Sequence, residues 1–385
     1  MKKLRKKAAA IWSAALALSL VVTSGVGYPG GGMVAHAEGE IIISTAEDLQ
    51  KIGTDAAYPL SGDYVLSADI DMAGVDFTPI GGGSGTRGAS SGDNVFTGTF
   101  DGGNHIISNL SIHKNGNSAQ DWQYGLFGII GSDSDSDKAS VKNLILTGVD
   151  VNVDMSGSGY LSLGGLAGEI NHNAEIDNVA VIDGTVTGNP SNGGDVVGVG
   201  GLVGEMRYEA QGSGSWGGSW GGQQTAGNNG VSLSNIYVGA DVISGGSKDN
   251  NYAAGMIGRI AKSSPASMTA CLFTGTAGFK GNSGYGISGG DMKANISNCY
   301  YLPNSGIANT GTAVSEEQLK SGTLLAGFSD NYWTAKAGAF ILPKHCAQSE
   351  VIEGILALSG LSLCLADGDT LSAVSGNFTV PMSIQ

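Results

Sequence analysis

The chain has 385 residues, of which 65 are glycine and 41% are hydrophobic, and its formal net charge at pH 7 is −15. The glycines follow no three-residue period and the hydrophobic fraction is large, which excludes a collagen and an intrinsically disordered chain. The acidic excess argues against a nucleic-acid partner and an anionic membrane surface, because both attract clustered lysine and arginine. We expect the charge to keep an extracellular surface soluble.

Residues 1–37 have the pattern of a secretory signal peptide. A basic segment opens the chain, residues 8–22 are apolar, and Ala35-His36-Ala37 is a small-x-small cleavage site. An uncleaved membrane anchor is the alternative, but the apolar run is shorter than the roughly 20 residues that span a bilayer. We therefore predict a secreted, extracellular or cell-surface protein that does not insert into a membrane after the signal is removed.

A glycine-rich element repeats along the chain. Residues 163–170, with the sequence LGGLAGEI, return 36 residues later as VGGLVGEM. Looser copies stand at 124–130, 252–260 and 285–290. Each copy is followed, after a variable spacer, by a second apolar element, which has asparagine at its third position in all cases but one: 141–146, 176–181, 233–238, 268–273 and 296–301. Two short apolar elements per unit predict a solenoid, since no unit can bury its apolar face alone.

The composition of these elements favours strands over helices. They are rich in valine and isoleucine, and their glycines permit tight corners and close approach between coils. Helical signals stand only at 44–52 and 314–320, where Ser44 and Ser315 open capping-box patterns. The predicted fold is all-β, a parallel β-helix (solenoid) with short capping helices at its ends.

The first coils are expected between residues 64 and 112. Asp101-Gly102-Gly103-Asn104 predicts a tight turn between two strands. Residues 107–110 match the second repeat element, which places the start of the regular coils there.

These residues resemble secreted bacterial proteins with GLUG repeats, whose core is Gly-Leu-apolar-Gly. The segments 125–128, 165–168 and 201–204 match this core, whereas 255–258 has methionine for leucine and 286–289 departs further. The resemblance covers roughly residues 40–343. It implies a right-handed parallel β-helix, as in adhesins and the non-catalytic region of IgA-type metallopeptidases, and it implies no activity.

The pattern changes near Glu350. Residues 351–381 resemble the start of a bacterial immunoglobulin-like module, but about 35 residues cannot supply the seven strands of that sandwich. The predicted organisation is a signal peptide at 1–37, a β-helix domain at 38–343, and a linker with a truncated immunoglobulin-like module at 344–385.

Metal sites are not predicted. Residues 133–137 alternate aspartate with serine like the opening of a calcium loop, but Lys138 and Leu144 occupy the positions that need glycine and glutamate. No His-Glu-x-x-His motif exists, and His105 and His172 are expected at the surface or in turns. We predict no cofactor.

Four aspartates, Asp69, Asp71, Asp76 and Asp101, could line one groove of a β-helix. Paired carboxylates in such grooves cleave glycosidic bonds. The sequence does not place any two of them at the required separation, so no catalytic residue is assigned.

An insertion at 212–230 interrupts the repeat and carries Trp216 and Trp220 between glycines. Insertions in a solenoid form loops on its flank, and exposed tryptophans dominate contacts with sugars or protein partners. These two residues are the predicted ligand contact, and the alternative is that they fold back onto the solenoid.

Four cysteines, Cys271, Cys299, Cys346 and Cys364, permit disulfides in an exported chain. Cys271 and Cys299 occupy similar places in successive second elements, which indicates buried strand positions where a free thiol packs as a small apolar group.

The sequence thus favours a non-enzymatic secreted or cell-surface scaffold that binds a host or cell-surface protein or glycan. A carbohydrate-active β-helix enzyme, such as a glycoside hydrolase or polysaccharide lyase, is the first alternative. An accessory region of a secreted peptidase is the second. Convergence of two carboxylates, or of a basic residue, in one groove would favour the enzyme.

Overall fold

The structure of the chain is a computed structural model. It describes residues 39–82, 94–116, 122–131, 138–155, 160–171, 173–190, 196–207, 230–246, 251–261, 266–279, 282–290, 295–303, 310–347, 374–375 and 378–379. The chain divides into two compact units, Met1–Glu38 and Gly39–Gln385. The predicted signal peptide at 1–37 lies outside the described residues, so the following description concerns the second unit.

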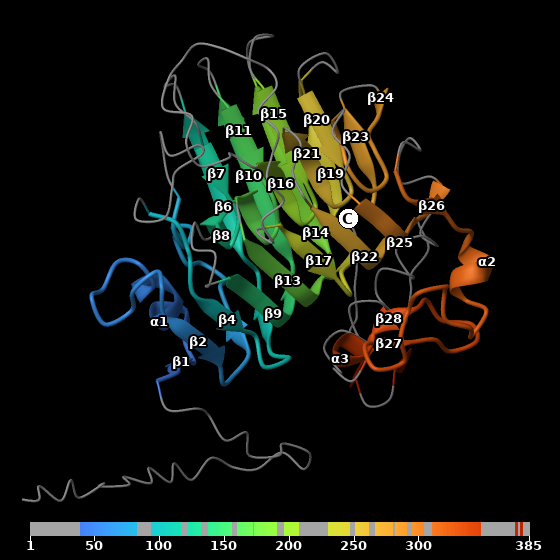
Figure 1. Cartoon of the computed structure of the whole chain (residues 1–385), viewed down its shortest axis with the longest axis horizontal. Coiled ribbons are helices and arrows are strands. Elements are labelled where there is room, and N and C mark those ends of the chain that lie inside the picture. The colour runs from blue at the N-terminus through green and yellow to red at the C-terminus, as the bar shows by residue number, and fades with distance from the viewer. Residues whose placement is uncertain are drawn as a thin grey trace, which may run out of the picture. The chain divides into compact units, whose positions relative to one another are not determined.

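The longest sheet, sheet A, extends along the whole stack of coils (Figure 1). Its main path runs through β1 (Ile41–Ile43), β2 (Asp63–Leu66), β4 (Thr99–Asp101), β9 (Ala139–Thr147), β13 (Ala174–Val181), β17 (Ser232–Ser234), β22 (Ser267–Phe273), β25 (Asn295–Tyr301) and β26 (Thr312–Ala313). Three further short strands pair within it: β3 (Ile70–Asp71), β5 (Ile106–Ser108) and β18 (Tyr237–Val238).

Three other sheets complete the coils. Sheet C contains β6 (Ser111–Gly116), β10 (Val149–Met155), β14 (Gly184–Pro190), β19 (Asp241–Ser244), β23 (Ala277–Phe279) and β24 (Asn282–Ser283). Sheet D contains β7 (Trp122–Tyr124), β11 (Tyr160–Leu163), β15 (Val196–Gly200) and β20 (Asn251–Ala254). Sheet B contains β8 (Phe127–Ile130), β12 (Ala167–Ile170), β16 (Val203–Arg207) and β21 (Ile257–Ala261).

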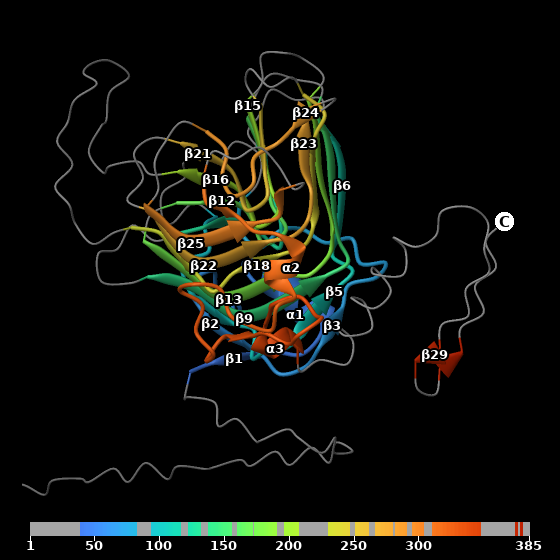
Figure 2. The same ribbon diagram turned by 90° about the vertical axis from the view of Figure 1, so that its right-hand side faces the viewer.

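A regular coil passes through sheets A, C, D and B in that order, and its strands pair in parallel with those of the next coil. Figure 2 shows the four sheets around the stack, with sheet B on the left and sheet C on the right. The predicted all-β parallel β-helix is therefore confirmed, and its right-handedness stays an expectation from the resemblance. β24 is different, because it pairs with β23 in the antiparallel direction and so ends sheet C.

The Gly-Leu-apolar-Gly motif forms the corner between sheets D and B. The backbone N–H of Leu166 donates to the Leu202 carbonyl at 2.9 Å, Leu202 to Met256 at 3.1 Å, and Met256 to Ile287 at 3.0 Å. All four side chains are buried. The copies at 255–258 and 286–289, which depart from leucine, therefore occupy the same corner, because methionine and isoleucine fill the same apolar position.

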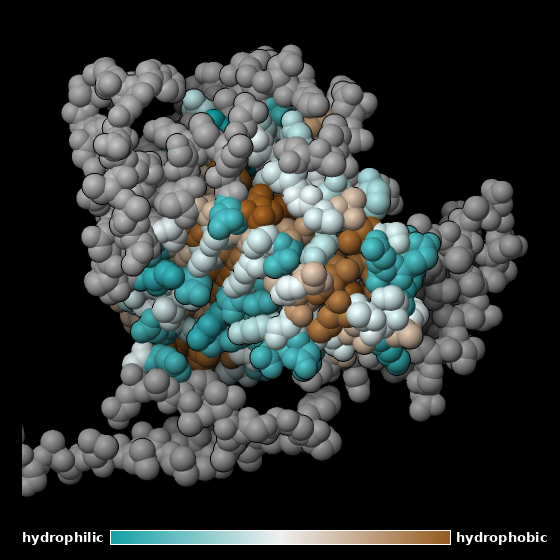
Figure 3. Space-filling view, turned by 45° about the vertical axis from the view of Figure 1, so that its right-hand side comes forward, coloured by the Kyte–Doolittle hydropathy of each residue, from teal (hydrophilic) through white to brown (hydrophobic). Residues whose placement is uncertain are grey.

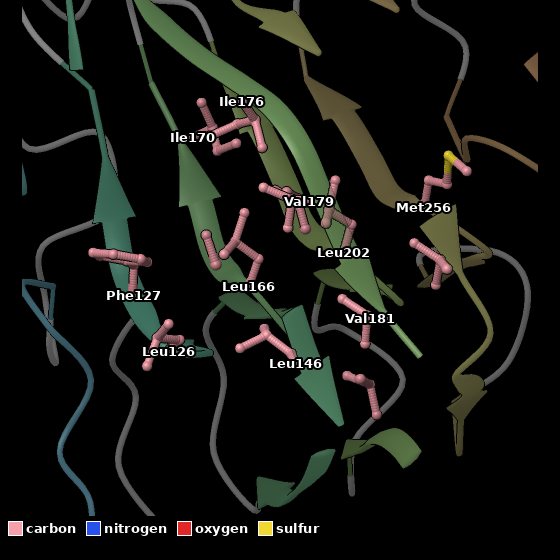
Figure 4. Close-up of a cluster of buried hydrophobic side chains, with 14 of the residues drawn as sticks. Leu126, Phe127, Leu146, Leu166, Ile170, Ile176, Val179, Val181, Leu202 and Met256 are labelled. Carbon is pink, nitrogen blue, oxygen red and sulfur yellow. The ribbon is translucent and has the colours of Figure 1, made fainter. Parts of the chain in front are cut away.

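The core lies between the sheets and consists almost entirely of aliphatic and aromatic side chains. Figure 4 shows the corner residues Leu126, Leu166 and Leu202 beside side chains of sheet A, and Met256 belongs to the same core cluster. Each coil adds another layer to one continuous core, which is the stabilising principle of a solenoid.

The second repeat elements are apolar on both faces for a specific reason. Val179 and Val181 of β13 point into the core, whereas Ala180 belongs to a second cluster on the other face of sheet A. Residues 310–347, here called the C-terminal strap, cover that face with Leu319, Trp333 and other apolar side chains. The inward residues of these strands are therefore buried in the core, and the outward residues are buried under the strap.

The strap consists of β26, α2 (Glu316–Leu319), β27 (Trp333–Thr334), β28 (Leu342–Pro343) and α3 (Lys344–Ala347). β27 and β28 form a short antiparallel pair, and β28 leads directly into α3, where His345 and Cys346 are buried. Packing of this unit therefore continues past residue 343.

The expected helices occur, but their roles differ in part from the prediction. α1 (Ala46–Lys51) adds Leu49 to the core near the first strands, and its N-cap is Thr45 rather than Ser44. Ser315 and Gln318 form the predicted capping box of α2. α2 and α3 contribute Leu319 and Cys346 to the apolar cluster on the outer face of sheet A, where a continuous apolar strip needs cover.

The first coils begin earlier than predicted and in another register. Phe100 pairs with Val141, and Ile107 with Leu146, so residues 100–107 and not 107–110 are the counterpart of the second element. The predicted turn at 101–104 exists, but β4 and β5 both pair in parallel with β9 and form no hairpin. The turn is inserted between β4 and β5, which together correspond to the single strand β9 of the next coil. Of the predicted immunoglobulin-like module, only the antiparallel pair β29 (Val374–Ser375) and β30 (Phe378–Thr379) is described.

Candidate functional site

Each of the four aspartates predicted from the sequence forms a hydrogen bond or an ion pair with a residue elsewhere in the chain. Asp69 accepts hydrogen bonds from the Ile106 backbone at 3.0 Å and contacts His105 at 3.1 Å. The bond with His105 is the main cause that lowers the pKa of Asp69. The carboxylate and the histidine thus join two successive coils.

The other three aspartates are placed differently. Asp71 accepts from Asn109 at 2.8 Å, and Asp101 accepts from Asn143 at 3.0 Å. Asp76 is almost fully exposed, and its carboxylate lies 3.6 Å from Lys114. The structure records no contact among the four carboxylates, and we assign them to links between coils and to the surface.

Several predicted features fall on residues that the structure does not describe. These are Trp216 and Trp220, the aspartates of 133–137, His172 and Cys364. Within the described ranges, no group of three or more His, Cys, Asp or Glu could hold a metal ion. The tryptophan contact therefore stays a prediction.

Sheet C presents regular columns of polar side chains on its outer face. In register along the stack, Ser111 is followed by Asp150, Thr185 and Asp241 in one column, and His113 by Asn152 and Thr187 in the next. Val151, Val186 and Val242 alternate with them and point into the core. The outward side chains include hydroxyl, amide and carboxylate groups, which are the groups that hydrogen-bond sugars and polar peptide segments.

Some of the outward side chains of sheet C are bonded to each other, both between neighbouring columns and along one column. His113 contacts Asp150 at 2.7 Å, and Asn189 donates to Asp154 at 2.8 Å. Side chains held in this way are partly ordered before a ligand arrives, which lowers the entropy lost on binding.

Sheet A carries a similar polar surface on the part that the strap leaves open, and hydrophilic residues form rows on the face that it presents in Figure 3. The columns run through Thr99, Ser140, Glu175, Ser232, Ser267 and Asn295, and through Asp101, Lys142, Asp177, Ser234, Thr269 and Ser297. Ser234 donates to Asp177 at 2.6 Å. The outer faces of sheets A and C are thus two polar platforms with strand spacing of about 4.8 Å.

A charged column also stands in sheet B. Glu169, Glu205 and Arg259 occupy corresponding positions on β12, β16 and β21. Glu169 is 0% exposed and Glu205 is 2% exposed. Both glutamates belong to the repeated glycine-rich element, and a charge that recurs there beside apolar residues is the sequence signal of this column.

The buried charge of Glu205 has a positively charged partner in this column. Glu205 accepts from Arg259 at 2.8 Å and from Ser162 of sheet D at 3.2 Å. The guanidinium of Arg259 also lies 5.7 Å from the ring centre of Tyr252. An arginine that replaces glutamate on the third coil thus supplies the positive charge that buried carboxylates need.

Glycine brings sheets B and D close together beside this column. A Cβ atom on Gly168 would lie 2.5 Å from the Tyr124 nitrogen and 2.7 Å from the Gln123 carbonyl carbon. Because these are backbone atoms, no side-chain movement could relieve the contact. Glu169 and Glu205 lie beside this close approach in the stack and are buried.

Comparisons with known proteins give limited similarity. No family model matches the chain. Over 166 residues, 43% of the chain, it is 32% identical to halomucin of Haloquadratum walsbyi (strain DSM 16790 / HBSQ001). The chain covers 2% of the length of that protein.

A solved structure from Bacteroides ovatus, described as a "putative immunoglobulin A1 protease", also has a similar trace. The likeness covers 79% of this chain and 92% of the other, with 16% sequence identity and a TM-score of 0.48. Similarity at this level transfers no activity. Among the described residues, no helix has the length and apolar character needed to span a membrane.

Proposed function

We propose that the chain is a secreted or cell-surface, non-enzymatic scaffold that presents its β-helix for binding a protein or a glycan. The observation that carries the proposal is the pair of polar platforms on sheets A and C. They repeat hydroxyl, amide and carboxylate groups at coil spacing on a rigid stack. Such a surface offers many equivalent hydrogen-bonding positions to an extended polymer.

The similarity to part of halomucin is compatible with this proposal, since repeated β-structure suits long surface proteins. The location outside the cell is proposed from the signal-peptide pattern of residues 1–37. Trp216 and Trp220 are proposed as an additional contact, because aromatic rings stack on the apolar faces of sugars and anchor protein interfaces.

The carbohydrate-active alternative has one observation in its favour. Glu169 and Glu205 stand on neighbouring strands, and strand spacing of about 4.8 Å is close to the separation of carboxylates in retaining glycosidases. Their burial weighs against it, because a substrate bond must lie between the two carboxyl groups. The scaffold is therefore the preferred function.

A glycan and surface-protein array probed with residues 38–385 tests the proposal, with reducing-end release assayed on every glycan that binds. We expect binding without release. Three double variants are compared, one for each candidate contact surface. They are Asn152→Ala/Thr187→Ala on sheet C, Ser267→Ala/Thr269→Ala on sheet A, and Trp216→Ala/Trp220→Ala. Loss of at least tenfold in affinity in one pair locates the contact, whereas release of sugar ends that Glu205→Gln abolishes would replace the scaffold by the enzyme.

A further inference from the structure

Cys271 and Cys299 occupy corresponding positions on the last two long strands of sheet A. They are direct partners in the parallel register of β22 and β25. Both are buried, with exposed fractions of 0% and 1%, and both belong to the core that sheet A shares with the other sheets. They are free thiols in this structure.

The regular coils that precede them carry aliphatic side chains at this position. Leu144 pairs with Val179 on the preceding coils, and Ile236 stands next to Cys271 along the same column. The same inward position is therefore aliphatic on the earlier coils and cysteine on the two adjacent coils that follow. Cys346, in contrast, belongs to the cluster on the opposite face of sheet A.

The geometry is close to that of a disulfide. Direct partners on neighbouring strands are about 4.8 Å apart, within the range of Cα separations that disulfides span. The Cβ atoms must approach each other by roughly 1 Å to reach the mean separation in disulfides. β25 has one long neighbour in sheet A, because β26 pairs only with Tyr300 and Tyr301 on its other side.

We propose that Cys271 and Cys299 form a disulfide that joins the last two long coils of the solenoid when the chain folds in an oxidising compartment. A low-molecular-weight disulfide, such as oxidised glutathione, is the oxidant. The thiolate of one cysteine attacks it to give a mixed disulfide and releases one thiol. The second cysteine then attacks the mixed disulfide and releases the other thiol, so that two protein thiols are oxidised and one small disulfide is reduced.

The reaction belongs to the folding phase rather than to the finished fold. Burial, followed by contact with the Cys299 sulfur, raises the pKa of the Cys271 thiol well above its usual range. Since the thiolate is the attacking species, exchange is slow once the coil has closed. The cross-link forms while β25 docks on β22, and later burial protects it from reductants.

The test uses the full chain folded in a glutathione redox buffer, denatured at low pH, alkylated and mapped by mass spectrometry. We expect Cys271 and Cys299 in one cross-linked peptide, unmodified by the alkylating reagent. We also expect the melting temperature of the oxidised chain to fall by about 5 °C on reduction in denaturant and refolding with reductant.

Two variants separate this pair from other pairings. The Cys346→Ala/Cys364→Ala chain should form the same cross-link, and the Cys271→Ala chain should lose both the cross-link and the effect of reductant on melting. Complete alkylation of Cys271 and Cys299 in the oxidatively folded wild-type chain would overturn the proposal, as would their recovery in peptides linked to Cys346 or Cys364. Because the peptide map is read on the wild-type chain, the test does not depend on the folding of a variant.

Discussion

Asparagine holds a left-handed backbone conformation at the same place on successive coils. Asn143, Asn178, Asn235 and Asn298, each the third residue of a second repeat element, have φ between 52° and 56°. Asparagine tolerates this region better than other side chains that carry a Cβ. The side chains add bonds between coils, since the Asn178 amide donates to the Asn143 oxygen at 2.9 Å. The bend of each strand therefore favours asparagine at this position.

The exception, Ala270, gives the first prediction. It has φ 54° without an amide side chain. Ala270→Asn should stabilise the protein by about 1 kcal/mol, because the strain of a left-handed alanine is relieved. Urea unfolding measures the difference. Ala270→Gly should give a similar gain, whereas Asn178→Ala should destabilise; an unchanged or lower stability of both Ala270 variants would contradict the role of the conformation.

The charged column of sheet B gives a second prediction at the same scale. Arg259→Gln leaves the carboxylate of Glu205 without its guanidinium partner in a buried place. We expect a loss of about 3 kcal/mol in the free energy of unfolding. Adding Glu205→Gln should recover part of this loss, and the exposed pair Lys114–Asp76 provides the control, because Lys114→Gln should change stability by less than about 1 kcal/mol. A small effect of Arg259→Gln alone would contradict this account.

At the scale of the elements, the corner between sheets D and B depends on two glycines with different tasks. A Cβ on Gly165 would lie 2.7 Å from the Gly201 carbonyl of the next coil and 3.3 Å from Val181 of sheet A. Gly168 faces the backbone of sheet D instead. The first glycine lets the corner approach the core, and the second lets two sheets lie close together.

Gly168→Ala tests this division. The new methyl group would meet backbone atoms of Gln123 and Tyr124, so we expect a loss of about 3 kcal/mol in the free energy of unfolding. Gly74→Ala is the matched control: it also adds one methyl group, but no atom lies within 4 Å and only its positive φ is strained. Its loss should be about 1 kcal/mol. Equal losses in the two variants would show that close packing at the corner is not the reason for the glycine.

At the scale of the whole molecule, the strap joins six coils through one apolar cluster. It contacts side chains from β5 to β25, and the Trp333 indole donates to Asn235 at 3.3 Å. Coils in a solenoid otherwise contact only their neighbours, so a segment that crosses several of them should make their unfolding more cooperative.

The strap also carries a pH-dependent group. Burial lowers the pKa of His345 to about 4, because the charged imidazolium loses its contact with water. Because the unfolded histidine titrates near 6.5, the unfolded chain binds the proton first as the pH falls. Stability is then highest above pH 6.5 and decreases as the pH falls toward 4.

We expect this group to reduce the free energy of unfolding by about 2 kcal/mol between pH 7 and pH 5. The comparison is between the wild type and His345→Leu, whose curve should be flatter by this amount, with His113→Leu as an exposed control. Parallel pH profiles for all three proteins would contradict the contribution of His345.

The sequence by itself determined the solenoid and its repeats, because periodic glycines, strand formers and apolar residues are local signals that each coil must repeat. It also determined the capping box at Ser315 and the buried positions of Cys271 and Cys299. The register of the first coils was wrong, since a turn inserted at 101–104 divides one strand of sheet A into β4 and β5 without breaking its pairing with β9.

Only the tertiary structure decided how distant segments meet. The continuous apolar runs of the second elements do not reveal that the strap covers their outer face, because either a covering segment or a partner would satisfy them. The compensation of Glu205 by Arg259 depends on stacking residues 54 positions apart. Local sequence specifies conformation, whereas charge pairing and cover of apolar surface are set by residues that become neighbours only when the coils stack.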